Sequence, residues 1–198
     1  MNRPERTLRA DARRNREAIL DAAAALFAQH GGDVQMEDIA AAAGVGVGTL
    51  YRHFVDKRTL RAAIIGRRFA TMTALAEEAE QLDEAWAAFT SLLDGYLAAA
   101  EPDAAFRLAI LGPEEPAWRD IEAEKRAFSA VVERIVRRAV DAGALRADFR
   151  ADDFILITRG AMANMTGTGD WRRHLALQLD GIAAAAPGER PPGQAGAQ

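Results

Sequence analysis

The stretch from Met36 to Phe54, MEDIAAAAGVGVGTLYRHF, decides the fold of the N-terminal part of this chain. It contains two short helical patterns separated by a turn. In the first pattern, small and apolar residues recur at intervals of three and four and share one helix face: Met36, Ile39, Ala40 and Ala43. Gly44 follows directly, and glycine accepts the positive φ with which many helices end. We therefore predict a helix over Met36–Ala43 that ends at Gly44.

The second pattern predicts a helix over Val47–Phe54, with Val45 buried between the two helices. Its apolar positions are Leu50 and Phe54. The other side carries glycine, hydroxyl, imidazole and cationic groups: Gly48, Thr49, Tyr51, Arg52 and His53. Two short helices joined by a tight turn with glycine are typical of a helix-turn-helix, whose second helix enters the major groove of DNA.

The run AAAAGVGVGTLYRHFVDKRTL resembles the DNA-binding signature of the tetracycline-repressor (TetR) family. The residues that match the family pattern in order and spacing are Ile39, Ala40, Ala43, Gly44, Val45, Gly48, Thr49, Leu50, Tyr51, His53, Phe54 and Lys57. Two positions depart from it: Gly46 stands where members usually have serine or threonine, and Gln35 where many have threonine. Glycine is a weaker N-cap than serine by only roughly a few tenths of a kcal/mol, so the helix is still expected to form.

The resemblance implies a sequence-specific, DNA-binding transcriptional regulator. It implies a repressor that binds a near-palindromic operator in double-stranded DNA as a homodimer and that a small apolar or amphipathic effector releases. The expected DNA-binding residues are Arg13, Arg14, Val47, Gly48, Thr49, Tyr51, Arg52, His53 and Lys57. Val47 and Gly48 begin the second helix of the motif, so they are expected to lie nearest the base edges.

Two other interpretations of this stretch are weaker. A core helical hairpin without a partner does not explain why Tyr51, Arg52 and His53 gather polar and cationic groups within about two helical turns. A phosphate- or dinucleotide-binding loop is suggested by the glycines at 44, 46 and 48. Such a loop follows a strand, however, and here an alanine-rich helix precedes the glycines.

The charge distribution favours DNA binding by one end of the chain, although the net charge is −4. Residues 1–68 carry 12 lysines and arginines against 8 acidic residues, or +4, whereas residues 69–198 carry 13 against 21, or −8. A basic end on an acidic remainder suits a protein that contacts the DNA polyanion with that end only. Residues 1–12 hold three of these arginines without an apolar face and are predicted to be a flexible basic arm.

Since no segment shows sustained alternation of period two, the chain is predicted to be all-α, with about nine helices. A three-helix DNA-binding head is expected over residues 1–56, its first helix spanning 12–30. A helical bundle for effector binding and dimerisation is expected over 57–186. Asp56 is a suitable N-cap for a long helix over 57–81, which would be the only covalent connection between head and bundle.

Further helices are predicted from the apolar spacing at 86–96, 106–111, 118–140, 154–165 and 170–182. Asp148 or Asp152 is the expected cap of the helix that contains Phe154. Residues 187–198 are rich in proline and glycine and poor in apolar residues, which predicts a disordered tail.

The aromatic residues of the 57–186 region are mostly expected in the core, but the family resemblance also implies an effector pocket there. Its candidate lining residues are Phe69, Met72, Trp86, Phe89, Tyr96, Phe106, Trp118 and Phe128. The resemblance further implies that the last two helices pair with their copies in a four-helix bundle. The candidate dimer contacts are Phe154, Ile157, Ala161, Met165, Trp171, Leu175 and Leu179. The alternative is that these residues pack within one subunit.

The composition excludes several kinds of site. There is no cysteine, the two serines lie outside a nucleophile elbow, and the three histidines lack metal-ligand spacing. We therefore expect no enzyme, no metal site and no cofactor. No apolar run is long enough to span a bilayer, and the N-terminus lacks the apolar run of a signal peptide, so a cytoplasmic protein without a membrane partner is expected.

Two alternatives from other functional classes stay open. One is a helical enzyme or small-molecule carrier with a vestigial head, and the other is a structural DNA-packaging protein. Binding to specific and scrambled DNA distinguishes them, because a carrier binds neither and a packaging protein binds both.

Overall fold

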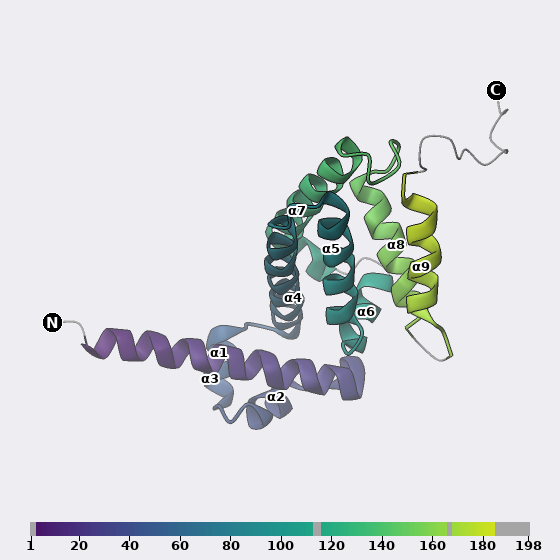
Figure 1. The fold of residues 1–198 in the computed structure, drawn as a ribbon. Coiled ribbons are helices and arrows are strands. Elements are labelled where there is room, and N and C mark those ends of the chain that lie inside the picture. The colour runs from purple at the N-terminus through teal and green to yellow at the C-terminus, as the bar shows by residue number, and fades with distance from the viewer. Residues whose placement is uncertain (1–2, 113–115, 166–167, 185–198) are drawn as a thin grey trace. The chain divides into compact units, whose positions relative to one another are not determined.

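The computed structural model describes residues 3–112, 116–165 and 168–184, and in this part of the chain it contains helices and no strand. The all-α prediction is therefore confirmed. The α-helices are α1 (Arg3–His30), α2 (Met36–Ala42), α3 (Val47–His53), α4 (Lys57–Glu80), α5 (Ala85–Ala100), α6 (Ala104–Leu111), α7 (Glu122–Asp141), α8 (Ala151–Ala163) and α9 (Trp171–Ile182) (Figure 1). Two 3-10 helices, η1 (Gly31–Asp33) and η2 (Pro116–Ile121), follow α1 and precede α7.

The helices are distributed over two compact units, Met1–Ala74 with Ala98–Phe128 and Leu75–Leu97 with Ser129–Gln198. The predicted boundary after residue 56 does not separate these units, because the first half of α4, α6 and the start of α7 belong with the head. The Phe69 ring of α4 lies 6.1 Å from Phe106 and 6.0 Å from Phe128, measured between ring centroids. Three helices, α4, α5 and α7, run from one of these units into the other, whereas residues 1–56 continue into the rest of the chain through α4.

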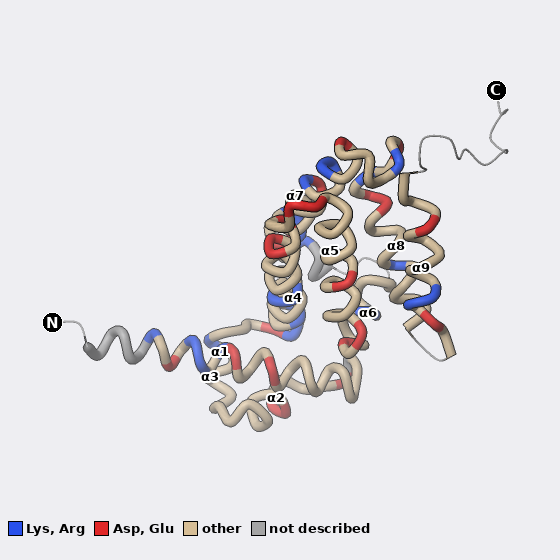
Figure 2. The backbone as a smooth tube through the Cα atoms, in the orientation of Figure 1, with Lys and Arg blue, Asp and Glu red and all other residues tan. Residues whose placement is uncertain are grey.

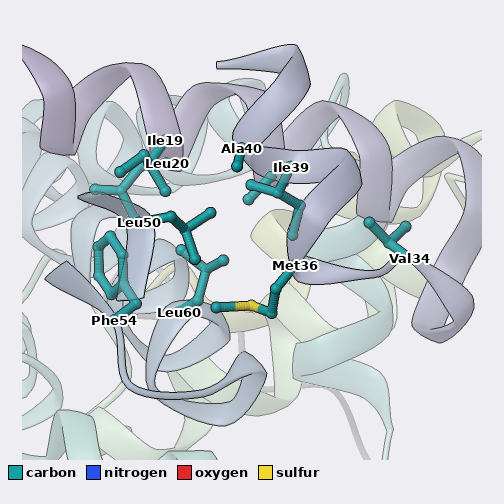
Figure 3. Packing of buried hydrophobic residues seen from close by; sticks show 10 residues of the cluster. Ile19, Leu20, Val34, Met36, Ile39, Ala40, Leu50, Phe54 and Leu60 are labelled. Atoms are coloured by element: carbon teal, nitrogen blue, oxygen red, sulfur yellow. The ribbon is translucent and has the colours of Figure 1, made fainter. Parts of the chain in front are cut away.

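The head of the first unit is held together by a small apolar cluster (Figure 3). Its buried residues come from α1, α2, α3, the start of α4 and the connecting segments: Ile19, Leu20, Ala23, Val34, Met36, Ile39, Ala40, Leu50, Phe54 and Leu60. Burying a leucine, isoleucine or phenylalanine side chain stabilises a fold by about 1.5–3 kcal/mol. The head is therefore fixed mainly by this cluster, which includes both apolar positions predicted for α3. Val45 packs against the cluster but is only partly buried.

The turn between α2 and α3 has the geometry that its glycines predict. Gly44 has φ 66°, and the Val45 amide donates to the Ala40 carbonyl oxygen at 3.0 Å. Gly46 is the N-cap of α3 with φ −68° and ψ 144° and has no side-chain cap. Its carbonyl oxygen accepts from Thr49 N at 2.8 Å and from Leu50 N at 3.1 Å. The serine that family members usually carry is therefore not needed for α3 to form.

The prediction of a flexible arm over residues 1–12 differs from the structure, in which α1 already begins at Arg3. Residues 3–11 contain no glycine, and their one proline, Pro4, stands in the first helical turn, where its missing N–H costs little. The remaining residues mostly have good helix propensity. Because residues 3–11 lack an apolar stripe, the sequence gives no periodic signal for a helix there, although the helix propensity of these residues is good.

In the second unit, α8 and α9 form an antiparallel pair, shown side by side in Figure 1. Asp170 caps α9 by accepting from Arg173 N at 2.9 Å, but neither Asp148 nor Asp152 caps α8. Arg150 is the N-cap there, and its amide donates to Asp153 Oδ2 at 2.8 Å. Asp148 instead accepts from Arg146 Nε at 2.5 Å, and this ion pair lowers the pKa of the Asp148 carboxyl. The predicted tail, 187–198, lies outside the described residues.

Candidate nucleic-acid interface

Helix α3 turns one face into the head and leaves the other to solvent. Leu50 is fully buried, whereas Val47 and Tyr51 are 42% and 43% exposed. Gly48 and Arg52 are exposed as well. A Cβ atom added to Gly48 would meet nothing within 4 Å, so the backbone of the first turn is open to a partner. The N-terminal part of α3 therefore presents small side chains and an accessible backbone to solvent.

The second turn of α3 holds a guanidinium beside a hydroxyl. Arg52 Nη2 donates to Thr49 Oγ1 at 2.9 Å, which fixes both side chains on the exposed side of the helix. Arginine has five N–H donors, so this single bond leaves others for an anionic oxygen. His53 is partly buried, its ring tilted against that of Phe54 with 6.3 Å between centroids.

The start of α4 follows α3 after a short loop and is capped as predicted. Thr59 N donates to Asp56 Oδ1 at 2.7 Å, and the Thr59 hydroxyl donates to the Asp56 carbonyl oxygen at 2.9 Å. The hydrogen bonds from Thr59 lower the pKa of the Asp56 carboxyl. The cap fixes Lys57 as the first residue of α4, four positions beyond His53, where it is partly buried.

The N-terminal half of α1 supplies further cations. Its arginines gather in that half of the described helix, and none stands between Glu17 and His30 (Figure 2). Arg13 and Arg14 are exposed, but Arg14 pairs with Asp11, which offsets part of its charge. Sequence reasoning did not assign Arg16 to the site. Its guanidinium lies 5.4 Å from the centroid of the Phe54 ring, directly after α3. The only sequence signal was its place three residues after Arg13.

The predicted effector-pocket residues are divided between the two units. Phe69, Met72, Phe106 and Phe128 are buried in the first unit, where the phenylalanine rings pack against one another. Phe89 and Tyr96 are buried in the second, with rings 5.5 Å from Phe149 and 5.4 Å from Phe154. Trp86 is partly buried beside Phe89, and the side chain of Trp118 lies outside what the structure describes. These ring contacts are those of core residues. Of the eight predicted pocket residues, Phe106 lines a cavity.

Most of the predicted dimer contacts are buried within the single chain, which is the alternative stated above. Phe154, Ile157, Ala161, Trp171 and Leu175 are each less than 9% exposed, so they have little surface to offer a second copy. Met165 and Leu179 are partly buried. The exposed apolar residues of α8 and α9 are instead Ile155, Leu156 and Leu177, at 42%, 68% and 53%. The sequence does contain a sign that some apolar residues of α8 stay exposed. Residues 154–157 are four consecutive apolar residues, and a helix cannot turn all four to one side.

Within the described residues, no helix combines the length and the apolar character that crossing a bilayer requires.

Comparison with known proteins agrees with the geometry of α2 and α3. Residues 19–64 match the model of the family described as bacterial regulatory proteins, tetR family. An HTH-type transcriptional regulator of Staphylococcus aureus (strain MRSA252) is 43% identical over 75 residues, which are 36% of this chain. The chain spans only 39% of the length of that curated relative. A second S. aureus regulator of the same type, from strain USA300, is 44% identical over 61 residues, 30% of this chain and 33% of its own length.

Solved structures extend the likeness beyond the head. The TetR transcription regulatory protein from Mycobacterium vanbaalenii is 28% identical, with 89% of this chain and 99% of that chain covered and a TM-score of 0.66. FadR from Bacillus subtilis, a transcriptional regulator solved in complex with stearoyl-CoA, shares the fold at 16% identity, with 84% and 98% covered and a TM-score of 0.69. The family and these relatives are regulators, which confirms the prediction that the chain is not an enzyme.

Proposed function

This chain belongs to the TetR family of bacterial regulatory proteins, and we propose that it represses transcription by binding a near-palindromic operator as a homodimer. The observation that carries the proposal is the division of α3 into two faces. Leu50 is buried in the head, while Val47, Gly48, Tyr51 and Arg52 are presented to solvent from one short helix. A helix anchored in this way can enter a major groove without losing its own packing.

Val47 and Gly48 are proposed to lie nearest the base edges. The first residues of a recognition helix point into the groove. A valine side chain suits the methyl group of thymine, and glycine permits close approach of the backbone. Thr49, Tyr51, His53 and Lys57 are proposed to contact phosphates, with charge from Arg13, Arg14 and Arg52. The Thr49–Arg52 hydrogen bond supports this assignment, because it orients a guanidinium on the exposed side of the helix.

The homodimer is proposed to form through the exposed apolar residues of α8 and α9, Ile155, Leu156 and Leu177, in place of the residues expected from the sequence. These three large apolar side chains stay exposed on one pair of helices, which suits an association surface. A two-fold dimer of this kind presents two heads. They enter successive major grooves when they stand about 34–36 Å apart, or a multiple of that distance.

A small apolar or amphipathic effector is proposed to release the operator. The effector acts by binding better to the arrangement of the two heads that does not fit DNA. A tenfold loss of operator affinity requires about 1.4 kcal/mol of coupling. By reciprocity, the operator weakens effector binding by the same factor, which calorimetry with and without operator DNA measures.

DNA binding is tested by fluorescence anisotropy with the promoter region beside the coding gene and with a scrambled duplex of equal length. We expect specific binding whose affinity falls with salt. The chain has two lysines, Lys57 in the proposed interface and Lys125 on α7, where its Nζ lies 3.4 Å from Glu122 Oε2. Lys57→Ala should reduce the slope of log affinity against log salt by about one, and the control Lys125→Ala should leave it unchanged. Equal affinity for the scrambled duplex, or equal slopes for both variants, contradicts the proposal.

A further inference from the structure

The second residue of α4 is a cation whose charge is offset from within the chain. Arg58 directly follows Lys57, one of the proposed phosphate contacts, and its side chain is 54% exposed. Its Nη1 atom lies 3.3 Å from Oδ2 of Asp120, which belongs to the 3-10 helix η2. Both residues lie in the first unit. The start of α4 therefore carries one more cation than the proposed interface uses, and a carboxylate from far along the sequence is paired with it.

The position of Asp120 is fixed by the packing of its neighbours. Ile121 is only 2% exposed, and its Cγ2 atom would lie 3.2 Å from a Cβ atom added to Gly66 of α4. The Oε1 atom of Glu124, in the first turn of α7, would lie 3.6 Å from the same Cβ atom. Glycine thus lets η2 and the start of α7 approach α4 closely. This packing keeps Asp120 beside α4 without help from the ion pair.

The ion pair lies beside the cationic half of α1. Arg58 and Asp120 line a groove together with Arg16 of α1. The guanidinium of Arg16 lies 5.4 Å from the centroid of the Phe54 ring, directly after α3. Arg16 and Arg58 therefore line one groove next to the end of the proposed recognition helix, and Asp120 adds a negative charge to it.

We propose that Asp120 competes with the phosphates of bound DNA for the guanidinium of Arg58, so that this ion pair weakens DNA binding. Duplex DNA carries one negative charge per about 1.7 Å of its axis, and arginine forms strong, often bidentate hydrogen bonds with phosphate. An ion pair between two exposed side chains is weak by comparison, so DNA can break it. The inference rests on the proposed DNA binding but on no particular operator, since phosphate contacts carry no sequence information directly.

Fluorescence anisotropy with Asp120→Asn tests the competition. The amide has nearly the shape of the carboxylate without its charge, so it releases Arg58. DNA affinity at low salt should rise about two- to fivefold, which is the range that an exposed ion pair contributes. Glu122→Gln is the matched control, because it removes the same charge two positions further along, where Glu122 Oε2 lies 3.4 Å from Lys125 Nζ. Equal gains in the two variants overturn the proposal, since they report only the change in net charge.

Arg58→Ala separates the ion pair from the general charge of this surface. It should reduce the slope of log affinity against log salt by about one, as the loss of one phosphate contact does. In the Arg58→Ala background, Asp120→Asn should add no more affinity than Glu122→Gln. An unchanged slope in Arg58→Ala, or a gain from Asp120→Asn that persists without Arg58, contradicts the proposal.

Urea denaturation distinguishes a purely structural ion pair. If the pair only held η2 against α4, Asp120→Asn would lower the free energy of unfolding and leave DNA affinity unchanged, and this result would also overturn the inference. Circular dichroism checks that each variant is folded before its DNA affinity is compared with that of the wild type.

Two duplexes distinguish a failure of this inference from a failure of the proposed function. All variants are titrated with the promoter duplex and with the scrambled duplex, and the expected changes are the same on both. Equal affinity of the wild type for the two duplexes contradicts the proposed regulator, whereas the comparison of Asp120→Asn with Glu122→Gln still decides the inference. Specific binding without a gain in Asp120→Asn overturns the inference and leaves the proposed regulator standing.

Discussion

The DNA-binding head and the α8–α9 pair both bury leucines and aromatic rings, but they leave opposite chemistry exposed. On α3 the exposed side holds Tyr51, Arg52 and the open backbone of Gly48, with Leu50 fully buried. On α8 and α9 the exposed side includes Leu156 and Leu177, at 68% and 53%. The first surface suits a polyanion, and the second suits an apolar partner such as another copy of this chain. The pattern of burial within one chain thus indicates which exposed residues are available for contact with a partner.

The largest expected effect is on the buried side of α3. Leu50→Ala removes a fully buried side chain from the head cluster and should lower the free energy of unfolding by about 2–5 kcal/mol, with loss of operator binding. Urea denaturation measures the first and anisotropy the second. Val47→Ala, on the exposed side of the same helix, should change stability by less than about 0.5 kcal/mol while still affecting operator affinity. Similar losses of stability in both variants would remove the distinction between the two faces.

The next effect concerns the apolar surface of α8 and α9. Leu156→Glu should convert dimers into monomers and raise the dissociation constant of the dimer at least about a hundredfold. An isologous interface carries the substitution twice, and each buried leucine contributes about 1.5–3 kcal/mol. Sedimentation equilibrium measures the change. Leu175→Glu, at a residue only 5% exposed, should instead destabilise the subunit itself. A wild-type monomer at micromolar concentration contradicts this assignment.

The same glycine-to-alanine change should stabilise the two regions unequally. A Cβ at Gly48 meets nothing within 4 Å, so Gly48→Ala should stabilise the chain by about 0.5 kcal/mol through helix propensity. A Cβ at Gly160 of α8 lies 2.8 Å from His174 Nε2 of α9, so the imidazole must shift, and this offsets the gain in helix propensity from Gly160→Ala. Urea titrations of both variants decide, and a larger gain for Gly160→Ala than for Gly48→Ala would refute the contrast.

The smallest effect is a dependence on pH. The carboxyl of Asp56 has a folded pKa below its ordinary value of 3.8, because Thr59 donates hydrogen bonds to it. Its contribution is therefore fully present above pH 3.8 and is lost as the pH falls through the lower, folded pKa. The difference in unfolding free energy between wild type and Asp56→Ala should shrink in acid. Asp148→Ala, which removes the exposed pair with Arg146 in the second unit, should show a dependence of the same sign. A difference that grows in acid would contradict both expectations.

Much of the head was predictable because its signals are local. Gly44 ends α2 with positive φ, Asp56 caps α4, and the spacing of Met36 and Ile39 places both on the buried face of α2. These features depend on residues within three or four positions of one another, where backbone geometry leaves few choices. The start of α1 at Arg3 was missed because helix propensity without an apolar stripe gives no periodic signal.

The sequence by itself determined the all-α fold, the helix-turn-helix and the resemblance to the TetR family, and it predicted that Leu50 of α3 is buried while Tyr51 and Arg52 lie on the other side. Only the tertiary structure decided which of the apolar residues 154–157 face inward, and that Phe69, Phe106 and Phe128 pack together across a separation of about sixty residues. It also decided that Arg61 and Asp103 line one cavity. The physical reason is that helix formation depends on neighbours in the chain, whereas burial is a property of the whole packed unit. An apolar stripe predicts that one face of a helix is buried, but it does not tell which residues of other helices pack against that face.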